Sequence, residues 1–109
     1  MQDALTQLET TYVTMQQQIG MLLAACQAQQ DRDTITSQYV EARQNYWSCV
    51  NKAFHDDDPE VISLTTQLTT VNTALQTAVT QLDDIKKTID TITQAVSVGA
   101  SLAAKVIAV

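Results

Sequence analysis

The chain has 109 residues and a formal net charge of −6, and 45% of its residues are hydrophobic while only 5% are aromatic. This length suits a single domain, and an acidic chain without a basic stripe argues against nucleic-acid binding, which depends on Lys and Arg neutralising phosphates. The chain has only two glycines and one proline, so turn-forming residues are concentrated in one place. We therefore expect two long elements that pack along narrow stripes of aliphatic side chains.

The first half of the chain follows a helical heptad pattern with one defect. Apolar residues recur at alternating steps of three and four, at Leu5, Leu8, Tyr12, Met15, Ile19, Leu22 and Cys26. Polar residues then occupy the next positions of the pattern, at Gln29, Asp33 and Thr36. We expect one continuous helix over about 3–54 with a shift of phase near 25–32, and a break around 29–33 is the alternative.

An acidic turn is expected at residues 55–58. Asp58 can cap the next helix, and Pro59 suits its first position. The run from His55 to Asp58 is also the one cluster of potential metal ligands, but it lacks the spacing and central glycine of an EF-hand loop. We therefore expect a solvated turn with no metal or cofactor. We also expect no enzyme activity, since no Ser, His and Asp arrangement is evident.

The second half predicts a helix over about 59–107, because apolar residues hold the heptad pattern from Val61 to Val106 without a polar interruption. A short connection makes the two helices antiparallel neighbours, so residues 1–109 form one all-α hairpin resembling a coiled coil. Ile89 should lie in the seam and Thr88 on the outer face. The expected register pairs Met15 with Gly99, Tyr12 with Ala103, and Trp47 with Leu68.

Cys26 and Cys49 cannot form a disulfide within one helix, where they would lie about 35 Å apart. We expect both to be buried, reduced thiols, which fits a cytoplasmic protein. The polar and acidic N-terminus does not resemble a cleavable signal peptide. Secretion by a route without a cleaved signal remains open, so the sequence leaves the localisation unknown.

Two regions are candidate interfaces, because their apolar residues extend beyond the seam face: the stretch 39–47 and the C-terminal run 95–109. A two-helix hairpin buries only a narrow stripe on each arm, so a wider apolar face predicts further helices, supplied by oligomerisation into a bundle. The candidate interface residues are Tyr39, Tyr46, Trp47, Val98, Leu102 and Val109. The apolar run 95–109 is shorter than the roughly 20 residues that span a bilayer, although contact with a membrane surface is an alternative.

The plan of helix, acidic proline turn and helix resembles that of small subunits of bacterial injection needles and related helical filaments, whose outer surfaces are similarly rich in Thr, Gln and Ser. The pattern favours a non-enzymatic structural or adaptor hairpin that packs against copies of itself or another helical protein. The alternative is a small membrane-acting or toxin-complex component that uses residues 95–109. These two hypotheses differ in whether the C-terminal segment meets protein or lipid.

Overall fold

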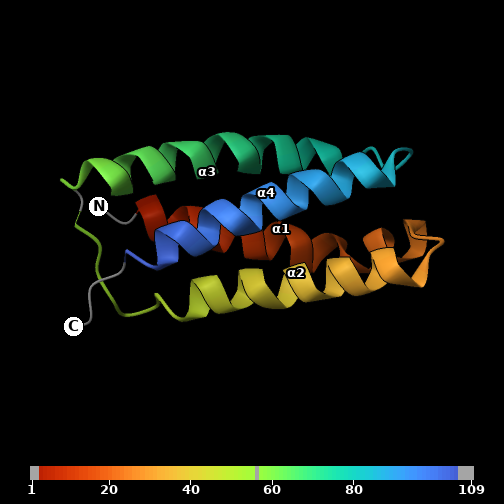
Figure 1. Cartoon of the computed structure of the whole chain (residues 1–109), viewed down its shortest axis with the longest axis horizontal. Helices are drawn as coiled ribbons and strands as arrows, with labels where there is room; N and C mark the ends of the chain where they lie inside the picture. Colours follow the sequence, from red (N-terminus) through yellow and green to blue (C-terminus); the bar gives the residue numbers. More distant parts are fainter. Residues whose placement is uncertain (1–2, 56, 106–109) are drawn as a thin grey trace.

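The computed structural model describes residues 3–55 and 57–105, and these residues form four α-helices and no strand (Figure 1). The helices are α1 (Asp3–Ala25), α2 (Gln29–Trp47), α3 (Pro59–Ala78) and α4 (Ile85–Ala103). They lie side by side in a bundle that measures 43 × 21 × 19 Å. The all-α prediction is therefore confirmed.

The prediction of a two-helix hairpin is wrong in its detail. A continuous helix of about fifty residues would be about 75 Å long at 1.5 Å per residue, whereas the longest dimension of the fold is 43 Å. Each of the two expected helices reverses direction near its middle. The helix–turn–helix plan implied by the resemblance to needle subunits is likewise not the observed plan, because four shorter helices close around one core.

The chain runs up, down, up and down through the bundle, so α1 is antiparallel to α2 and parallel to α3 (Figure 1). In the same way α4 is antiparallel to α3 and parallel to α2. Within the described residues α2 and α3 occupy opposite corners and are not neighbours, whereas α1 and α4 approach each other across the shorter diagonal. The predicted pairing of Trp47 with Leu68 is therefore wrong, since these residues belong to α2 and α3.

The first reversal occupies residues 26–28, just before the break that the sequence offered as an alternative. It contains neither glycine nor proline. Side chains satisfy the backbone there instead, because the Cys26 thiol donates to the Leu22 carbonyl at 3.3 Å and Arg32 Nη2 donates to the Cys26 carbonyl at 2.8 Å. The end of α1 thus obtains its hydrogen-bond partners from residues of the turn and of α2.

The second reversal, over residues 79–84, was not predicted. The Asp84 side chain accepts from the Lys87 amide at 3.2 Å and so caps α4. Thr88 is only 2% exposed and donates to the Asp84 carbonyl at 3.3 Å. The prediction that Thr88 lies on the outer face is therefore wrong, and Ile89 is only partly buried, because the turn changes the direction in which α4 presents its faces.

The start of α3 confirms the sequence prediction. Asp58 is the N-cap and accepts from the Glu60 amide at 2.8 Å, and Pro59 is the first helical residue. Before this cap, Asn51 adopts φ = 65° in the left-handed region. Asparagine tolerates this conformation better than most non-glycine residues, which helps the chain cross from α2 to the diagonally opposite α3.

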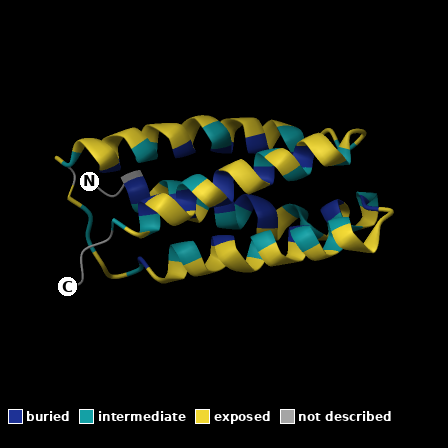
Figure 2. Cartoon of the chain, viewed as in Figure 1, coloured by how far each residue is buried: buried dark blue, intermediate teal, exposed yellow. Residues whose placement is uncertain are grey.

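Aliphatic side chains from all four helices fill the core (Figure 2). The tetrapeptide Asp-Thr-Ile-Thr occurs at 33–36 in α2 and again at 90–93 in α4, and both Ile35 and Ile92 are fully buried. Gly99 lets α4 approach its neighbours closely, since a Cβ there would lie 3.3 Å from both Leu8 Cδ2 and Asn45 Nδ2. The small glycine thus sets how closely α4 packs in the core.

One polar cluster lies within this core. Asn72 of α3 is 2% exposed and its Nδ2 donates to the backbone carbonyl and to the side-chain oxygen of Gln7, at 2.9 and 3.0 Å. The Thr11 hydroxyl donates to Asn72 Oδ1 at 2.6 Å. Because each polar atom of the Asn72 side chain has a partner on α1, the cluster fixes the register of these two parallel helices.

Candidate functional site

A stack of tyrosines joins α1 to α2. The ring of Tyr12 lies 5.9 Å from the rings of both Tyr39 and Tyr46, and Trp47 meets Tyr46 edge-on at 5.4 Å. Tyr46 also donates to Glu9 Oε2 at 2.9 Å. This hydrogen bond, with partial burial, raises the pKa of Tyr46, and burial beside Tyr12 raises that of Tyr39. Tyr39 and Tyr46 are thus largely occupied within the chain, where both stack on Tyr12.

The outer face of α2 carries apolar side chains that the bundle leaves in solvent. Trp47 is 55% exposed and Val40, two helical turns earlier, is 44% exposed. Arg43 and Gln44 lie between them and line a shallow depression with them. Asp33 continues the same line toward the start of α2 and is exposed. We call these five residues the α2 ridge.

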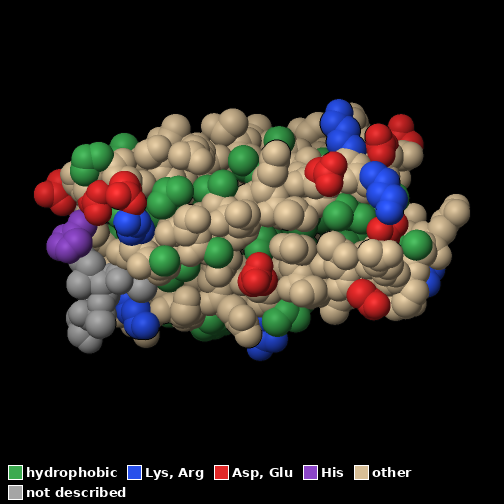
Figure 3. Space-filling model, in the orientation of Figure 1, with side chains coloured by type: hydrophobic (Ala, Val, Ile, Leu, Met, Phe, Trp, Pro, Cys, Tyr) green, Lys and Arg blue, Asp and Glu red, His purple; other side chains and the backbone are tan. Residues whose placement is uncertain are grey.

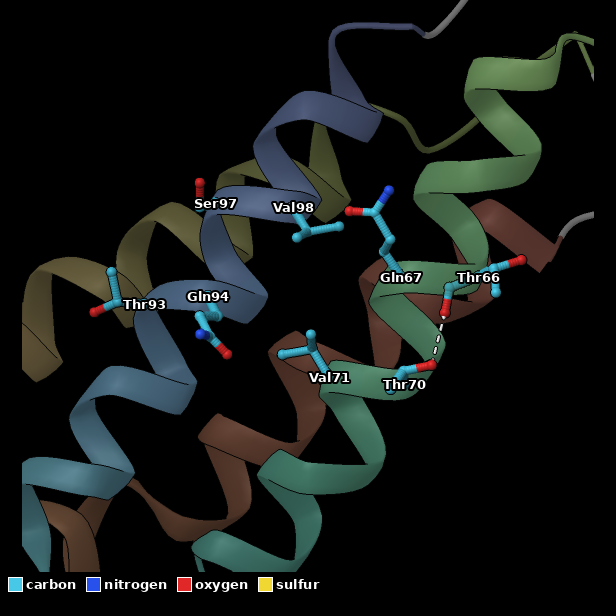
Figure 4. Close-up of a pocket in the computed structure, with 8 residues that line it drawn as sticks. All are labelled: Thr66, Gln67, Thr70, Val71, Thr93, Gln94, Ser97 and Val98. Carbon is cyan, nitrogen blue, oxygen red and sulfur yellow. Dashed lines mark hydrogen bonds between the residues drawn. The ribbon is translucent and has the colours of Figure 1, made fainter.

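A groove runs between α3 and α4 and encloses about 640 Å³. Figure 4 shows Val71 of α3 and Val98 of α4 lying between the two helices, with polar uncharged side chains around them. The Thr70 hydroxyl donates to the carbonyl of Thr66 at 3.1 Å. We call this site the α3–α4 groove, and its lining residues are Thr66, Gln67, Thr70, Val71, Thr93, Gln94, Ser97 and Val98.

The charged side chains gather mainly at the two ends of the bundle, and most of the surface between them on the face shown is uncharged (Figure 3). At one end Lys105 pairs with Glu60, and at the other Lys86 Nζ lies 2.9 Å from Asp31 Oδ1. The paired carboxylate raises the pKa of each lysine. One partner of each pair, Lys86 and Glu60, is largely exposed, so solvent screens the attraction and the contribution to stability is small. The pairs help to set the charge of each end.

The predicted interface residues do not form one surface. Tyr39 and Tyr46 belong to the tyrosine stack, Trp47 to the α2 ridge and Val98 to the α3–α4 groove. Leu102 is fully buried in the core, where it meets no solvent. Val109 lies outside the described residues.

Sequence reasoning missed several exposed apolar residues. Val40 was not among the predicted interface residues, although its spacing of two turns from Trp47 was the signal that both share one face. Met21 and Ile62 are also more than half exposed, at 61% and 53%. Val71 lies within the heptad pattern of the second half and was expected in the seam. The groove that it lines exists only where α3 packs beside α4, so the sequence pattern did not indicate it.

The two cysteines are buried, reduced thiols, as predicted. Cys26 follows the end of α1 and Cys49 follows the end of α2, so they lie at opposite ends of the bundle. Burial raises the pKa of each thiol, while nearby Asp31 adds to the effect at Cys26. Neither thiol has the depressed pKa and the exposure that a reactive cysteine requires.

Comparisons with protein-family models, curated proteins and solved structures found no match to this chain. Among residues 3–55 and 57–105, no three His, Cys, Asp or Glu side chains group in a way that could hold a metal ion. Nor does any helix in this part of the chain have the length and apolarity needed to cross a membrane.

Proposed function

We propose that this protein is a non-enzymatic structural or adaptor subunit that packs against other helices, in copies of itself or in another helical protein. The α2 ridge is the observation that carries the proposal. Trp47 and Val40 remain 55% and 44% exposed although the opposite face of α2 is packed in the core. Aromatic side chains such as Trp are enriched where one protein surface buries another.

The bundle already closes its own core, so a partner is not needed to complete the fold. This differs from the expectation that oligomerisation supplies the missing helices of a hairpin. A partner would instead cover a ridge on the outside of a finished four-helix unit. Such an interface can form and dissociate without unfolding the subunit, as suits a subunit or adaptor that assembles with others.

Trp47 is the only tryptophan of the chain, so its fluorescence reports directly on the α2 ridge. We expect the emission maximum to move to shorter wavelength and the mass in sedimentation to rise together as the concentration is raised. Val40→Glu should prevent both changes because it places a charge in the contact. Ile62→Glu is the matched control, since Ile62 is similarly exposed on α3, and it should behave as the wild type.

A wild-type chain that stays monomeric at high micromolar concentration, with an unchanging emission maximum, would contradict packing between copies. Equal loss of assembly in the Val40 and Ile62 variants would also count against the α2 ridge, because the charge would then act without regard to position. Far-ultraviolet circular dichroism of each variant separates a lost contact from a lost fold.

The membrane-acting alternative requires a larger rearrangement. Ala95 and Leu102, which belong to the apolar run 95–109, are both fully buried between helices. Contact with lipid through these side chains would need α4 to leave the bundle, which would expose its core face and the side chains packed against it. Liposome flotation tests this alternative, and absence of the chain from the floating fraction would remove it.

A further inference from the structure

We propose that the partner of the α2 ridge is the α3–α4 groove of a second copy of this chain, so that the copies assemble head to tail. This inference rests on the proposed function and names the partner. Each copy carries one ridge and one groove, and they lie on different sides of the bundle, since α2 occupies the corner diagonally opposite α3 (Figure 1). A subunit can therefore use both at once, and such heterologous contacts build rings or open filaments.

Both surfaces present apolar side chains. The ridge projects Val40 and Trp47, which lie about 10.5 Å apart along α2. The groove offers the apolar side chains of Val71 and Val98 between its two walls. A helix that lays an apolar ridge between two others is a recurring mode of protein recognition.

The chemistry of the groove also favours an apolar ridge. No charged residue lines it, so burying it does not require a charge to lose its water. The hydroxyl of Thr70 already donates to its own helix, which lowers the cost of covering it. The amide side chains of Gln67 and Gln94 can still exchange hydrogen bonds with Arg43 and Gln44 of the incoming ridge.

The charge at one end favours one direction for the incoming helix. Arg43 of the ridge and Lys52, which follows α2, make the region around the C-terminal end of α2 basic. The groove end near the start of α3 is acidic, because Asp57, Asp58 and Glu60 outnumber Lys105. An incoming α2 that runs parallel to the α4 of its new neighbour brings this basic end to this acidic end.

Contacts within one chain indicate the height of the incoming helix. There α2 runs parallel to α4, with Asp31 beside Lys86 near one end and Asn45 beside Val96 toward the other. An incoming α2 at a similar height brings Asp33 to the hollow beyond the groove, which Asp83, Asp84 and Lys87 line. Because these charges have both signs, the direction rests on the acidic end near the start of α3.

A complementation experiment tests the ridge-in-groove contact. Val40→Glu disables the ridge and leaves the groove intact, whereas Ser97→Glu disables the groove and leaves the ridge intact. Ser97 is exposed, so neither variant alters the core. Each variant alone should be monomeric, with self-association weakened by about tenfold or more. An equimolar mixture should form a dimer of twice the monomer mass, because the intact ridge of the Ser97 variant binds the intact groove of the Val40 variant. The dimer cannot grow further, because the ridge and the groove that stay free are the disabled ones.

Several outcomes would overturn the inference while leaving the proposed function standing. One is that Val40→Glu is monomeric but Ser97→Glu assembles normally, which would mean that the ridge meets another surface. Another is that both variants are monomeric and their mixture stays monomeric as well, as expected if ridge and groove of each copy both belong to one two-fold interface. A wild-type chain that never associates would instead contradict self-assembly altogether.

The direction of packing has its own test. Lys52→Glu should weaken wild-type association by roughly threefold, and adding Asp57→Lys to the same chain should restore it, because the opposite charges are exchanged across the contact. Gln30→Glu is the control, since Gln30 is exposed and belongs to the other end of α2. A further loss of association in the double variant would contradict the parallel direction.

Discussion

The polar cluster around Asn72 supplies the sharpest test of how the bundle is held in register. Replacing Asn72 by Ala removes two hydrogen bonds to Gln7 and one from Thr11. The loss on each partner is limited, because the Thr11 hydroxyl keeps a bond to the Gln7 carbonyl at 3.2 Å and the Gln7 side chain is only partly buried. With about 1 kcal/mol for each of two effective bonds and up to about 1 kcal/mol for the cavity, Asn72→Ala should cost about 2–3 kcal/mol.

Urea unfolding followed by circular dichroism measures this loss. A cost of about 2–3 kcal/mol lowers the midpoint by about 1–2 M urea for a domain of this size. Thr73→Ala is the control, because Thr73 is the next residue on α3 and faces solvent, and its midpoint should change little. Thr11→Val combined with Asn72→Ala should cost less than the sum of the single variants, since both remove the same bond.

If Asn72→Ala lies within about 0.5 kcal/mol of the wild type, the cluster is not a stabilising element and the reasoning above is wrong. Asn72→Leu combined with Thr11→Val separates stability from register. Because both polar partners are then replaced by apolar groups of similar shape, we expect this double variant to retain most of the stability. It should nevertheless show broader amide resonances on α1 and α3, because nothing polar then fixes their alignment.

Three further predictions concern glycine, cysteine and backbone conformation. Gly99→Val should destabilise the bundle by about 1–3 kcal/mol, because the added side chain crowds its neighbours. Gly20→Ala is the control: a Cβ there meets nothing within 4 Å, and the substitution should stabilise α1 by about 0.5–1 kcal/mol. A higher melting temperature for Gly99→Val than for Gly20→Ala would contradict the packing at Gly99. Stability should fall as pH rises above about 8.5, because Cys26 and Cys49 keep their protons to higher pH when folded than when unfolded; the double serine variant should show less of this loss. Asn51→Val should cost about 1–2 kcal/mol, because residue 51 has a positive φ that valine adopts poorly. Asn51→Gly should be neutral. Equal stabilities of the valine and glycine variants would argue against the left-handed conformation.

The start of α3 illustrates what local sequence can predict. Asp58, Pro59 and Glu60 act within a single turn, so their capping roles do not depend on distant residues. Likewise the heptad pattern correctly placed most core side chains inside, including Leu68, Leu75 and Ile92. The helical class, the apolar faces and the acidic proline turn could all be read before any fold was known.

The reversals at 26–28 and 79–84 show where that reading fails. Neither segment contains the glycine or proline that usually marks a turn, and Asp84 is the one capping residue that signalled the second. The heptad pattern is nearly the same for one long helix and for two shorter ones, because it records which face is apolar and not how far the helix continues. The helix ends were therefore not determined locally.

The candidate surfaces depend on tertiary structure for the same reason. Whether Leu102 is an interface residue or a core residue is decided by which helix lies over it, and α1, α2 and α3 together enclose α4 closely enough to bury it. The α3–α4 groove exists only between two packed helices, and Trp47 is exposed because α3 lies at the opposite corner. Sequence determined that this chain is helical and where its apolar faces lie. Closing four short helices removes more of those faces from water than a single pair would, and that gain fixed the reversals, the neighbours and the surfaces left outside.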